Sequence, residues 1–239
     1  MTWLGSYLAQ RSEAVVFKEA KSTPLSISSG VPQGSVLSPL LFSACLSPIS
    51  RLIDSFHLSH HIYADDISLF LSFDPTCNPL KTLNDCTLAL SNWLMSNGLL
   101  LNPLKSEVLW VGTKPQIQAS AAFNSDLRIA GIPVGPSDKV KVVGVIFDSN
   151  LSFSQHMSEV CRVVNFHLRA LAHIRKYLDK HTANTLAACI IGSRIDYCNC
   201  LFAGLSDSSL LRLQRLQNRA AYCFMHGASA RITLAPSCK

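Results

Sequence analysis

Apolar and polar residues alternate between positions 67 and 73, and this pattern predicts a β-strand with one buried face. Ile67, Leu69 and Leu71 are separated by Ser68, Phe70 and Ser72, which is the two-residue period of a strand. The preceding segment 57–64 can form the partner strand. We therefore expect residues 60–72 to form an antiparallel hairpin with Asp65 at or near its tip.

The segments on either side of this hairpin have different patterns. Residues 1–29 indicate a short amphipathic helix and then an extended piece, and the Gly- and Pro-containing residues 28–35 indicate a loop. A helix is expected next, with a kink at Pro48. After the hairpin, one helical face carries Leu83, Thr87, Leu90 and Leu94, and Asn97-Gly98 supplies a stop. Residues 99–112 predict a strand with a turn inside it, and residues 139–149 predict further strand around Gly144.

From about residue 153 the pattern becomes helical. Three periodic segments cover about 154–178, 181–203 and 206–225. We therefore expect an α+β fold in which residues 1–150 form one domain. Residues 151–239 are expected to form a helical region that ends in a short irregular tail.

Composition and charge narrow the possible partners and compartments. The chain has 239 residues, is 48% hydrophobic and 15% charged, and carries a net charge of +6. This basic excess permits a polyanionic partner. The nine cysteines suggest no disulfide framework, and Cys189, Cys198 and Cys200 lack the paired spacing of a zinc site, so their role is left open. We expect a cytoplasmic or nuclear protein that is neither secreted nor membrane-spanning.

Two adjacent carboxylates, Asp65 and Asp66, stand out in the apolar hairpin. Neighbouring carboxylates repel each other, which raises at least one pKa unless a cation is present. Mg²⁺ accepts one or two carboxylates together with phosphate oxygens, and two such ions can promote phosphoryl transfer. The alternative is a solvated turn that happens to contain two aspartates.

Four ordered motifs favour the metal interpretation. Tyr63-Ala64-Asp65-Asp66 matches the Tyr-x-Asp-Asp motif of reverse transcriptases, and it follows "SSGVPQGSVLSPLLF" at 28–42. "SNGLLLNPLKSEVLWVG" at 96–112 and "KVVGVIFD" at 141–148 come next, and the latter resembles the primer-grip hairpin. From about Trp3 to about residue 225, the chain resembles the reverse transcriptases of non-LTR (LINE-type) retrotransposons.

This resemblance implies a fold and an activity. Residues 1–150 would be a partial polymerase palm, an antiparallel sheet with packed helices, and residues 151–239 would be a thumb-like helical region. The family activity is RNA-directed DNA polymerisation by two-metal nucleotidyl transfer with Mg²⁺ or Mn²⁺. The implied partners are an RNA template, a DNA primer and deoxynucleotides.

The resemblance also assigns roles to individual residues. Asp65 would bind the metals, with Asp66 as a weaker participant, and Lys105 would neutralise the departing pyrophosphate. Gln33 and Gly34 would lie against template and nucleotide, and Tyr63 near the primer end. We expect Asp65 to lie close to both Gly34 and Lys105. The alternatives are that Gly34 only shapes a turn and that Lys105 is an ordinary solvated lysine.

The chain departs from the family pattern in one respect. The family's metal site includes a further aspartate upstream of the Gly-Val-Pro-Gln-Gly loop, whereas residues 1–29 contain only Glu13 and Glu19. We therefore expect an amino-terminally truncated chain that binds the metal weakly and does not extend a primer by itself. The alternative is a non-catalytic remnant that binds nucleic acid or a protein partner.

Basic residues recur with helical spacing in the last third of the chain. One set is Arg162, Arg169 and Lys176, and a second is Arg212, Arg215 and Arg219. Such stripes suit a nucleic-acid backbone, which is bound electrostatically and without sequence preference. The alternative is that both stripes are solvated faces of a helical bundle.

Overall fold

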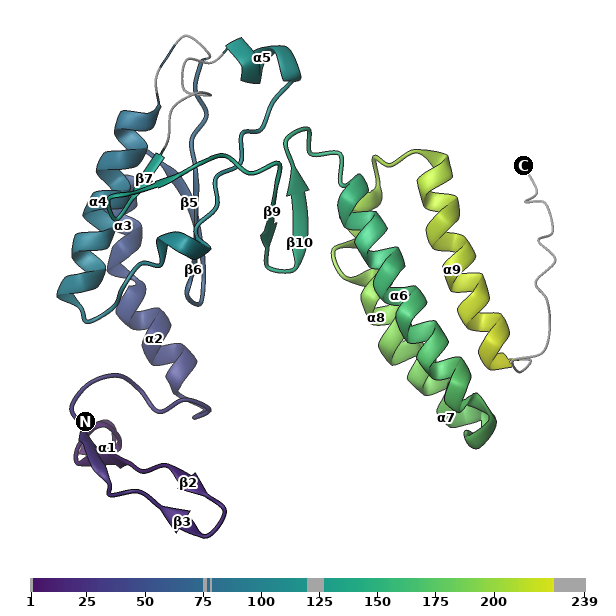
Figure 1. Ribbon diagram of the computed structural model, residues 1–239, viewed down its shortest axis with the longest axis horizontal. Helices are drawn as coiled ribbons and strands as arrows, with labels where there is room; N and C mark the ends of the chain where they lie inside the picture. The colour runs from purple at the N-terminus through teal and green to yellow at the C-terminus, as the bar shows by residue number, and fades with distance from the viewer. Residues whose placement is uncertain (1, 75–76, 78, 120–126, 226–239) are drawn as a thin grey trace. The chain divides into compact units, whose positions relative to one another are not determined.

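The computed structural model describes residues 2–74, 77, 79–119 and 127–225 (Figure 1), except for the side chains of residue 2 and residues 223–225. The chain divides into two compact units. The first contains residues 1–73 and 81–101, and the second contains residues 74–80 and 102–239. The end of the expected carboxy-terminal tail, residues 226–239, lies outside the described residues.

The first unit begins with a short helix and an extended ribbon. Helix α1 (Thr2–Leu8) is followed by β1 (Arg11–Glu13), which pairs antiparallel with β4 (Leu25–Ile27). Between them, β2 (Val16–Phe17) pairs with β3 (Ala20–Lys21). The predicted short helix and extended piece are confirmed, and the extended piece folds back on itself as a hairpin.

The rest of the first unit is a small helix-and-hairpin core. One residue, Ser47, separates helix α2 (Ser38–Leu46) from α3 (Pro48–Asp54), and the long helix α4 spans Leu80–Ser96. Strands β5 (Ser59–Tyr63) and β6 (Asp66–Phe70) form the predicted antiparallel hairpin. The break at Pro48 is a helix boundary because proline lacks the N–H that a continuing helix needs.

Apolar side chains from these elements form one buried cluster. Its core comprises Leu46, Ile49, Ile53, Leu58, Cys86, Leu90 and Leu94. The hairpin contributes Ile62, Ile67 and Leu69 to the edge of the same cluster. Burying each large apolar side chain contributes about 2 kcal/mol of stabilisation, and this packing anchors the hairpin.

The second unit contains two further hairpins. Strand β7 (Leu127–Ile129) pairs with β8 (Ile132–Val134), and β9 (Lys139–Val142) pairs with β10 (Val145–Asp148). The short helix α5 spans Lys114–Ala119. The β9–β10 hairpin confirms the expected extended structure around Gly144.

The strand predicted at residues 99–112 is wrong, but the turn predicted inside it is confirmed. This segment contains a 3₁₀ turn at Pro103–Lys105, and Val108 makes an isolated bridge with Pro136. Pro103 donates no backbone hydrogen bond, and the Asn102 side chain accepts from the Leu104 N–H at 3.1 Å. This local bond closes the predicted turn, and the residues on either side of it do not form the predicted strand.

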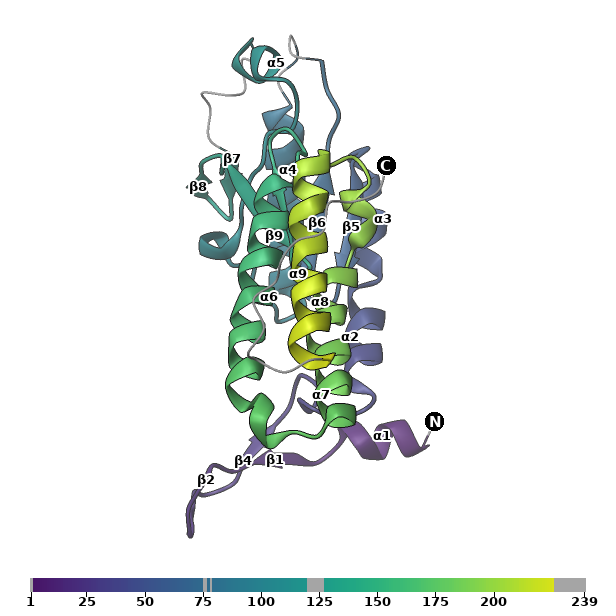
Figure 2. The same cartoon turned by 90° about the vertical axis from the view of Figure 1, so that its right-hand side faces the viewer.

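The remaining residues form a helical bundle with four α-helices in its described part. They are α6 (Ser154–Ile174), α7 (Lys180–Ala187), α8 (Ser193–Asp196) and α9 (Asp207–Met225). Both views show α6 and α9 side by side (Figures 1 and 2). The segment predicted at 181–203 is helical but not continuous, because a π-helical turn at Ala188–Gly192 and a 3₁₀ turn at Asn199–Phe202 interrupt it.

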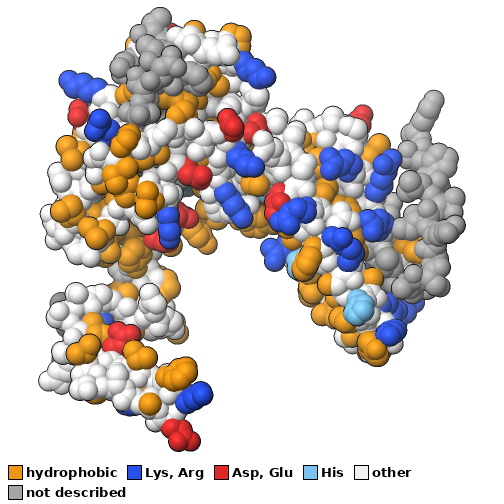
Figure 3. Space-filling view, viewed as in Figure 1, with side chains coloured by type: hydrophobic (Ala, Val, Ile, Leu, Met, Phe, Trp, Pro, Cys, Tyr) orange, Lys and Arg blue, Asp and Glu red, His pale blue; other side chains and the backbone are white. Residues whose placement is uncertain are grey.

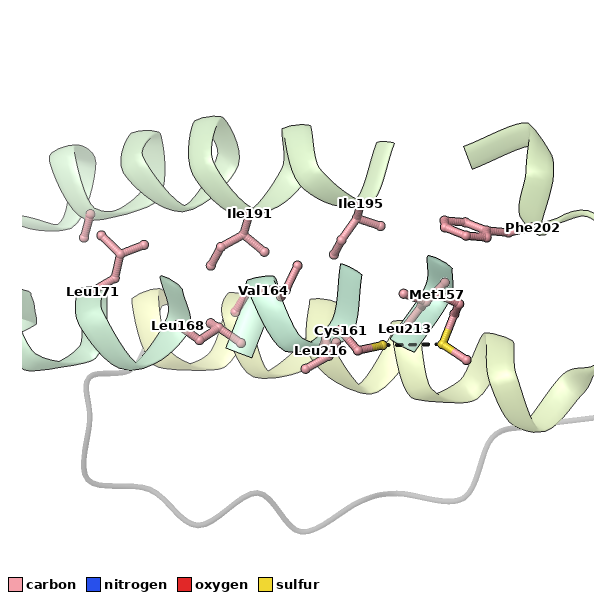
Figure 4. Close-up of a cluster of buried hydrophobic side chains, with 12 residues drawn as sticks. Met157, Cys161, Val164, Leu168, Leu171, Ile191, Ile195, Phe202, Leu213 and Leu216 are labelled. Carbon is pink, nitrogen blue, oxygen red and sulfur yellow. Dashed lines mark hydrogen bonds between the residues drawn. The ribbon is translucent and has the colours of Figure 1, made fainter. Parts of the chain in front are cut away.

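The bundle has its own core. Figure 4 shows Val164 and Leu168 of α6 among side chains from the other helices of the bundle. The Tyr197 hydroxyl donates to the Val143 carbonyl at 2.6 Å, which ties the bundle to the β9–β10 turn. No helix in the described ranges has both the length and the apolar character that a membrane span requires.

These elements confirm the predicted α+β class. The sheets among the described residues are short, antiparallel and two-stranded, with helices packed beside them. The predicted domain boundary at residue 150 stays a prediction.

Candidate active site and nucleic-acid interface

The tip of the β5–β6 hairpin presents both candidate metal ligands. Tyr63 pairs with Asp66 in the ladder, so Ala64 and Asp65 form the two-residue connection. Ala64 has a positive φ of 53°, a turn conformation that is uncommon for a residue with a side chain. Asp65 and Asp66 are exposed, and Tyr63 is 66% exposed. The hairpin therefore places two carboxylates and one aromatic ring in solvent on a core-anchored element.

The loop before α2 is held by hydroxyl groups. The Ser35 and Ser38 side chains are hydrogen-bonded at 2.7 Å, the Ser38 hydroxyl donates to the Pro32 carbonyl, and Tyr7 bonds to Ser35. The bond to Ser35, and a weaker one to Ser38, hold the pKa of Tyr7 below its ordinary value. No local pattern predicted this role of Tyr7, because 28 residues separate it from Ser35.

This network positions the two loop residues that the resemblance singled out. Gln33 and Gly34 are exposed, and Gly34 has a φ of +80°. No atom lies within 4 Å of where a Cβ at Gly34 would be, so the backbone conformation alone requires glycine. This geometry agrees with a turn-shaping role and also leaves the backbone accessible. Contact with template and nucleotide stays a prediction.

Lys105 ends the 3₁₀ turn and is exposed. It belongs to the second unit, whereas Gly34 and Asp65 belong to the first. The predicted approach of Asp65 to Lys105, and its approach to Gly34, stay predictions.

Asp65 and Asp66 do not complete a two-metal site by themselves. Across the described ranges, no group of three or more His, Cys, Asp and Glu side chains is arranged to hold a metal ion. Two carboxylates on one hairpin can supply part of a coordination shell, but two bridged ions need more oxygen ligands. The described residues therefore do not fit a complete two-metal centre.

Asp148, at the end of β10, could not supply the missing ligand. The residue is 7% exposed, and its carboxylate accepts four hydrogen bonds, from the N–H groups of Asn150, Ser152 and Phe153 and from the Ser152 hydroxyl. Burial alone raises its pKa, but these bonds outweigh burial and hold the pKa below its ordinary value. Asp148 therefore organises the turn that leads into α6. This role was not predicted, although an aspartate followed by serines before a helix is typical of capping turns.

Positive charge is concentrated in the helical bundle. Residues 154–225 contain nine Lys and Arg residues and four Asp and Glu residues, a net charge of +5 out of +6 for the chain. Figure 3 shows Lys and Arg side chains gathered over this part of the molecule. All six residues of the two predicted stripes are exposed: Arg162, Arg169, Lys176, Arg212, Arg215 and Arg219.

The stripe residues differ in their partners. Arg162 donates to both carboxylate oxygens of Glu159, at 2.6 and 2.8 Å, and this bond lowers the pKa of Glu159. The Lys176 ammonium lies 4.8 Å from the centre of the Tyr177 ring. Arg162 thus fits the solvated-face alternative best, because its charge is already compensated.

Three cysteines of this region stay without an assigned role. Cys189 and Cys200 are exposed, Cys198 is partly exposed, and all three are free thiols.

The expected cytoplasmic or nuclear location also stays a prediction.

The chain is similar to a known protein family and to two curated proteins. Residues 1–147 match the family model described as reverse transcriptase (RNA-dependent DNA polymerase). Two similar proteins from Drosophila melanogaster are the probable RNA-directed DNA polymerases from transposon BS, 25% identical over 233 residues, and from transposon X-element, 29% identical over 232 residues. Each match covers 91% of this chain and 24% of the relative. The chain therefore spans about a quarter of the length of these curated relatives.

Proposed function

This chain belongs to the reverse transcriptase (RNA-dependent DNA polymerase) family of LINE-type retrotransposons, and on that premise we propose that it supplies part of an RNA-directed DNA polymerase. Its contribution is the Tyr-Ala-Asp-Asp hairpin together with a basic helical bundle that holds nucleic acid. The observation that carries the proposal is the hairpin tip, where Asp65 and Asp66 are exposed on a hairpin whose strands are anchored in a buried core.

The proposed roles follow from the chemistry of each side chain. Asp65 and Asp66 contribute carboxylate oxygens to Mg²⁺ or Mn²⁺, the hard cations that such ligands prefer. Tyr63 offers an exposed ring beside the primer end. Lys105 supplies a positive charge toward pyrophosphate, because a lysine can act as a mobile point charge or an acid.

The loop before α2 faces the template and the incoming deoxynucleotide in this proposal. Gly34 permits close approach of a ligand because nothing occupies the space beside its Cα. Gln33 is exposed and offers both a donor and an acceptor. The bonds among Tyr7, Ser35 and Ser38 hold this loop in its conformation.

We further propose that the 239-residue chain alone does not extend a primer. The described carboxylates form only part of a metal centre, and phosphoryl transfer depends on metal positioning more than on covalent chemistry by the protein. Complementation with a family segment that carries a further aspartate-bearing strand should restore extension.

Primer extension on an RNA template tests both statements. The assay compares the chain alone, the chain fused to the preceding region of a Drosophila relative, and the fusion with Asp65→Ala. Asp85→Ala is the matched control, because Asp85 is an exposed acid on α4 of the same unit. Extension by the fusion and its control, lost with Asp65→Ala, supports the proposal. Incorporation by the short chain that depends on Asp65 contradicts the proposed inactivity.

A second candidate function is nucleic-acid binding without catalysis. The concentration of charge in residues 154–225 favours it, since this net charge of +5 does not depend on a complete metal site. Binding of labelled RNA and DNA over a range of salt concentrations tests it. Salt-sensitive binding by a chain whose fusion remains inactive would favour the binding function, and absence of binding would exclude it.

A further inference from the structure

Two arginines from different helices meet at one asparagine in the seam between α6 and α9. The Arg219 Nη1 donates to the Asn165 Oδ1 at 2.8 Å, and the Arg169 Nε donates to the Asn165 backbone carbonyl at 3.3 Å. Asn165 and Arg219 are 54 residues apart in the sequence. The two basic stripes are therefore joined at this point.

The orientation of the Asn165 amide is set by a third hydrogen bond. Its Nδ2 donates to the Cys161 carbonyl at 2.8 Å, one helical turn earlier. Because the amide nitrogen is committed to that carbonyl, the amide oxygen must face Arg219. Asn165 is thus a fixed acceptor that holds one guanidinium through its side chain and another through its backbone.

Among the described residues, no carboxylate forms an ion pair with Arg169 or Arg219. Glu159 is the one acidic residue of α6, and it is already hydrogen-bonded to Arg162. It also precedes Arg169 by ten positions, or about 15 Å along a helix axis. Asp207, the acid of α9, precedes Arg219 by twelve positions, or about 18 Å. Both arginines therefore contact Asn165, and neither is paired with a carboxylate of the described residues.

Two cations that contact the same residue and lack a carboxylate partner favour the binding of a polyvalent anion. Each guanidinium uses one N–H group in the bonds above and retains others for a ligand. A phosphate group has oxygens that can accept from two guanidiniums at once, and charge-assisted bonds of this kind are strong and directional. A surface that only needed solubility would not require a fixed acceptor between the two arginines.

We propose that Arg169 and Arg219 clamp a single backbone phosphate of a bound nucleic acid, with Asn165 as the positioning residue. This proposal rests on the proposed function and specifies one contact within it. The clamp reads the phosphate and not the base, so it acts equally on RNA and DNA.

A double-mutant cycle in the full chain tests the clamp. Binding to a fluorescent RNA–DNA duplex is measured by anisotropy for Arg169→Ala, Arg219→Ala and the double variant, over a range of salt concentrations. Each single substitution should weaken binding about tenfold, because it removes a charge-assisted bond. The double variant should weaken it by clearly less than the product of the two, because both residues serve one phosphate.

Substitution of Asn165 distinguishes a positioning role from a purely structural one, because only a positioning role changes the coupling between the two arginines. In an Asn165→Ala background the coupling between the two arginines should disappear, so that their effects multiply. Asn165→Asp retains an acceptor for Arg219 but adds a negative charge, and it should weaken binding while the bundle stays folded by circular dichroism. Matched controls are Asn218→Ala and Arg194→Ala, which alter exposed residues on α9 and α8.

The outcomes separate the two proposals. Wild-type binding with coupled arginines supports the clamp. Multiplicative arginine effects in the wild-type background, or Asn165 variants that bind like Asn218→Ala, overturn the clamp and leave nucleic-acid binding intact. If the wild-type chain binds neither RNA nor DNA, both the clamp and the proposed binding function are wrong.

Discussion

Asp148→Asn should destabilise the helical bundle, because the buried carboxylate of Asp148 organises the turn into α6. Its Oδ1 accepts from the N–H groups of Asn150 and Ser152 at 3.1 and 3.0 Å. Its Oδ2 accepts from the Ser152 hydroxyl and the Phe153 N–H, both at 3.0 Å. Asparagine has nearly the same shape but retains only one accepting oxygen.

The size of the effect follows from the bonds that are lost. An amide nitrogen cannot accept from Phe153, and the Ser152 hydroxyl can rotate to another partner. Hydrogen bonds to a charged group contribute about 1.5–3 kcal/mol each, and an unpaired buried donor adds a desolvation cost. We expect Asp148→Asn to lower the free energy of unfolding of the second unit by about 2–4 kcal/mol.

The same bonds predict a pH dependence. The pKa of folded Asp148 lies below its ordinary value, so the ionised form is the one that folding favours. The stabilisation is therefore complete above the unfolded pKa of about 3.9 and is lost as the pH falls through the folded pKa. The difference between wild type and Asp148→Asn should shrink below about pH 4.

Hydrogen exchange resolved by peptide measures this effect locally. Protection of α6 should fall in Asp148→Asn, while α4 provides an internal reference because it belongs to the first unit. Asp138→Asn changes an exposed acid of the second unit and should alter protection by less than about 0.5 kcal/mol. Unchanged α6 protection at pH 7, or a difference that persists undiminished well below pH 4, would refute the reasoning.

Two further substitutions test the packing of α6 and the β9–β10 turn of the second unit. Leu168→Ala, at a core position of α6 that is 3% exposed, should cost about 2–5 kcal/mol in urea unfolding, whereas Leu211→Ala at a 46% exposed position should cost little. Gly144→Ala should destabilise the β9–β10 turn by about 1–2 kcal/mol because its φ is +84°; an effect no larger than that of Gly204→Ala would contradict this reasoning.

The elements with a strong local period were predictable. The alternation around Asp65 predicted the β5–β6 hairpin, and the apolar spacing predicted α4, α6 and α9. These predictions succeeded because a buried face imposes its period on the residues that form it. The strand predicted at 99–112 does not form, because Pro103 and the turn closed by the Asn102 side chain interrupt the apolar segment.

Local patterns were enough to predict the hairpin that carries Asp65 and Asp66 and the helical character after residue 153, because each depends on residues that are close along the chain. The basic excess follows from composition alone. Contacts between distant residues became visible only in the folded chain. Folding brings Arg219 to Asn165 across 54 residues and Tyr7 to Ser35 across 28. Such contacts depend on how helices and turns pack against one another, which no local period encodes.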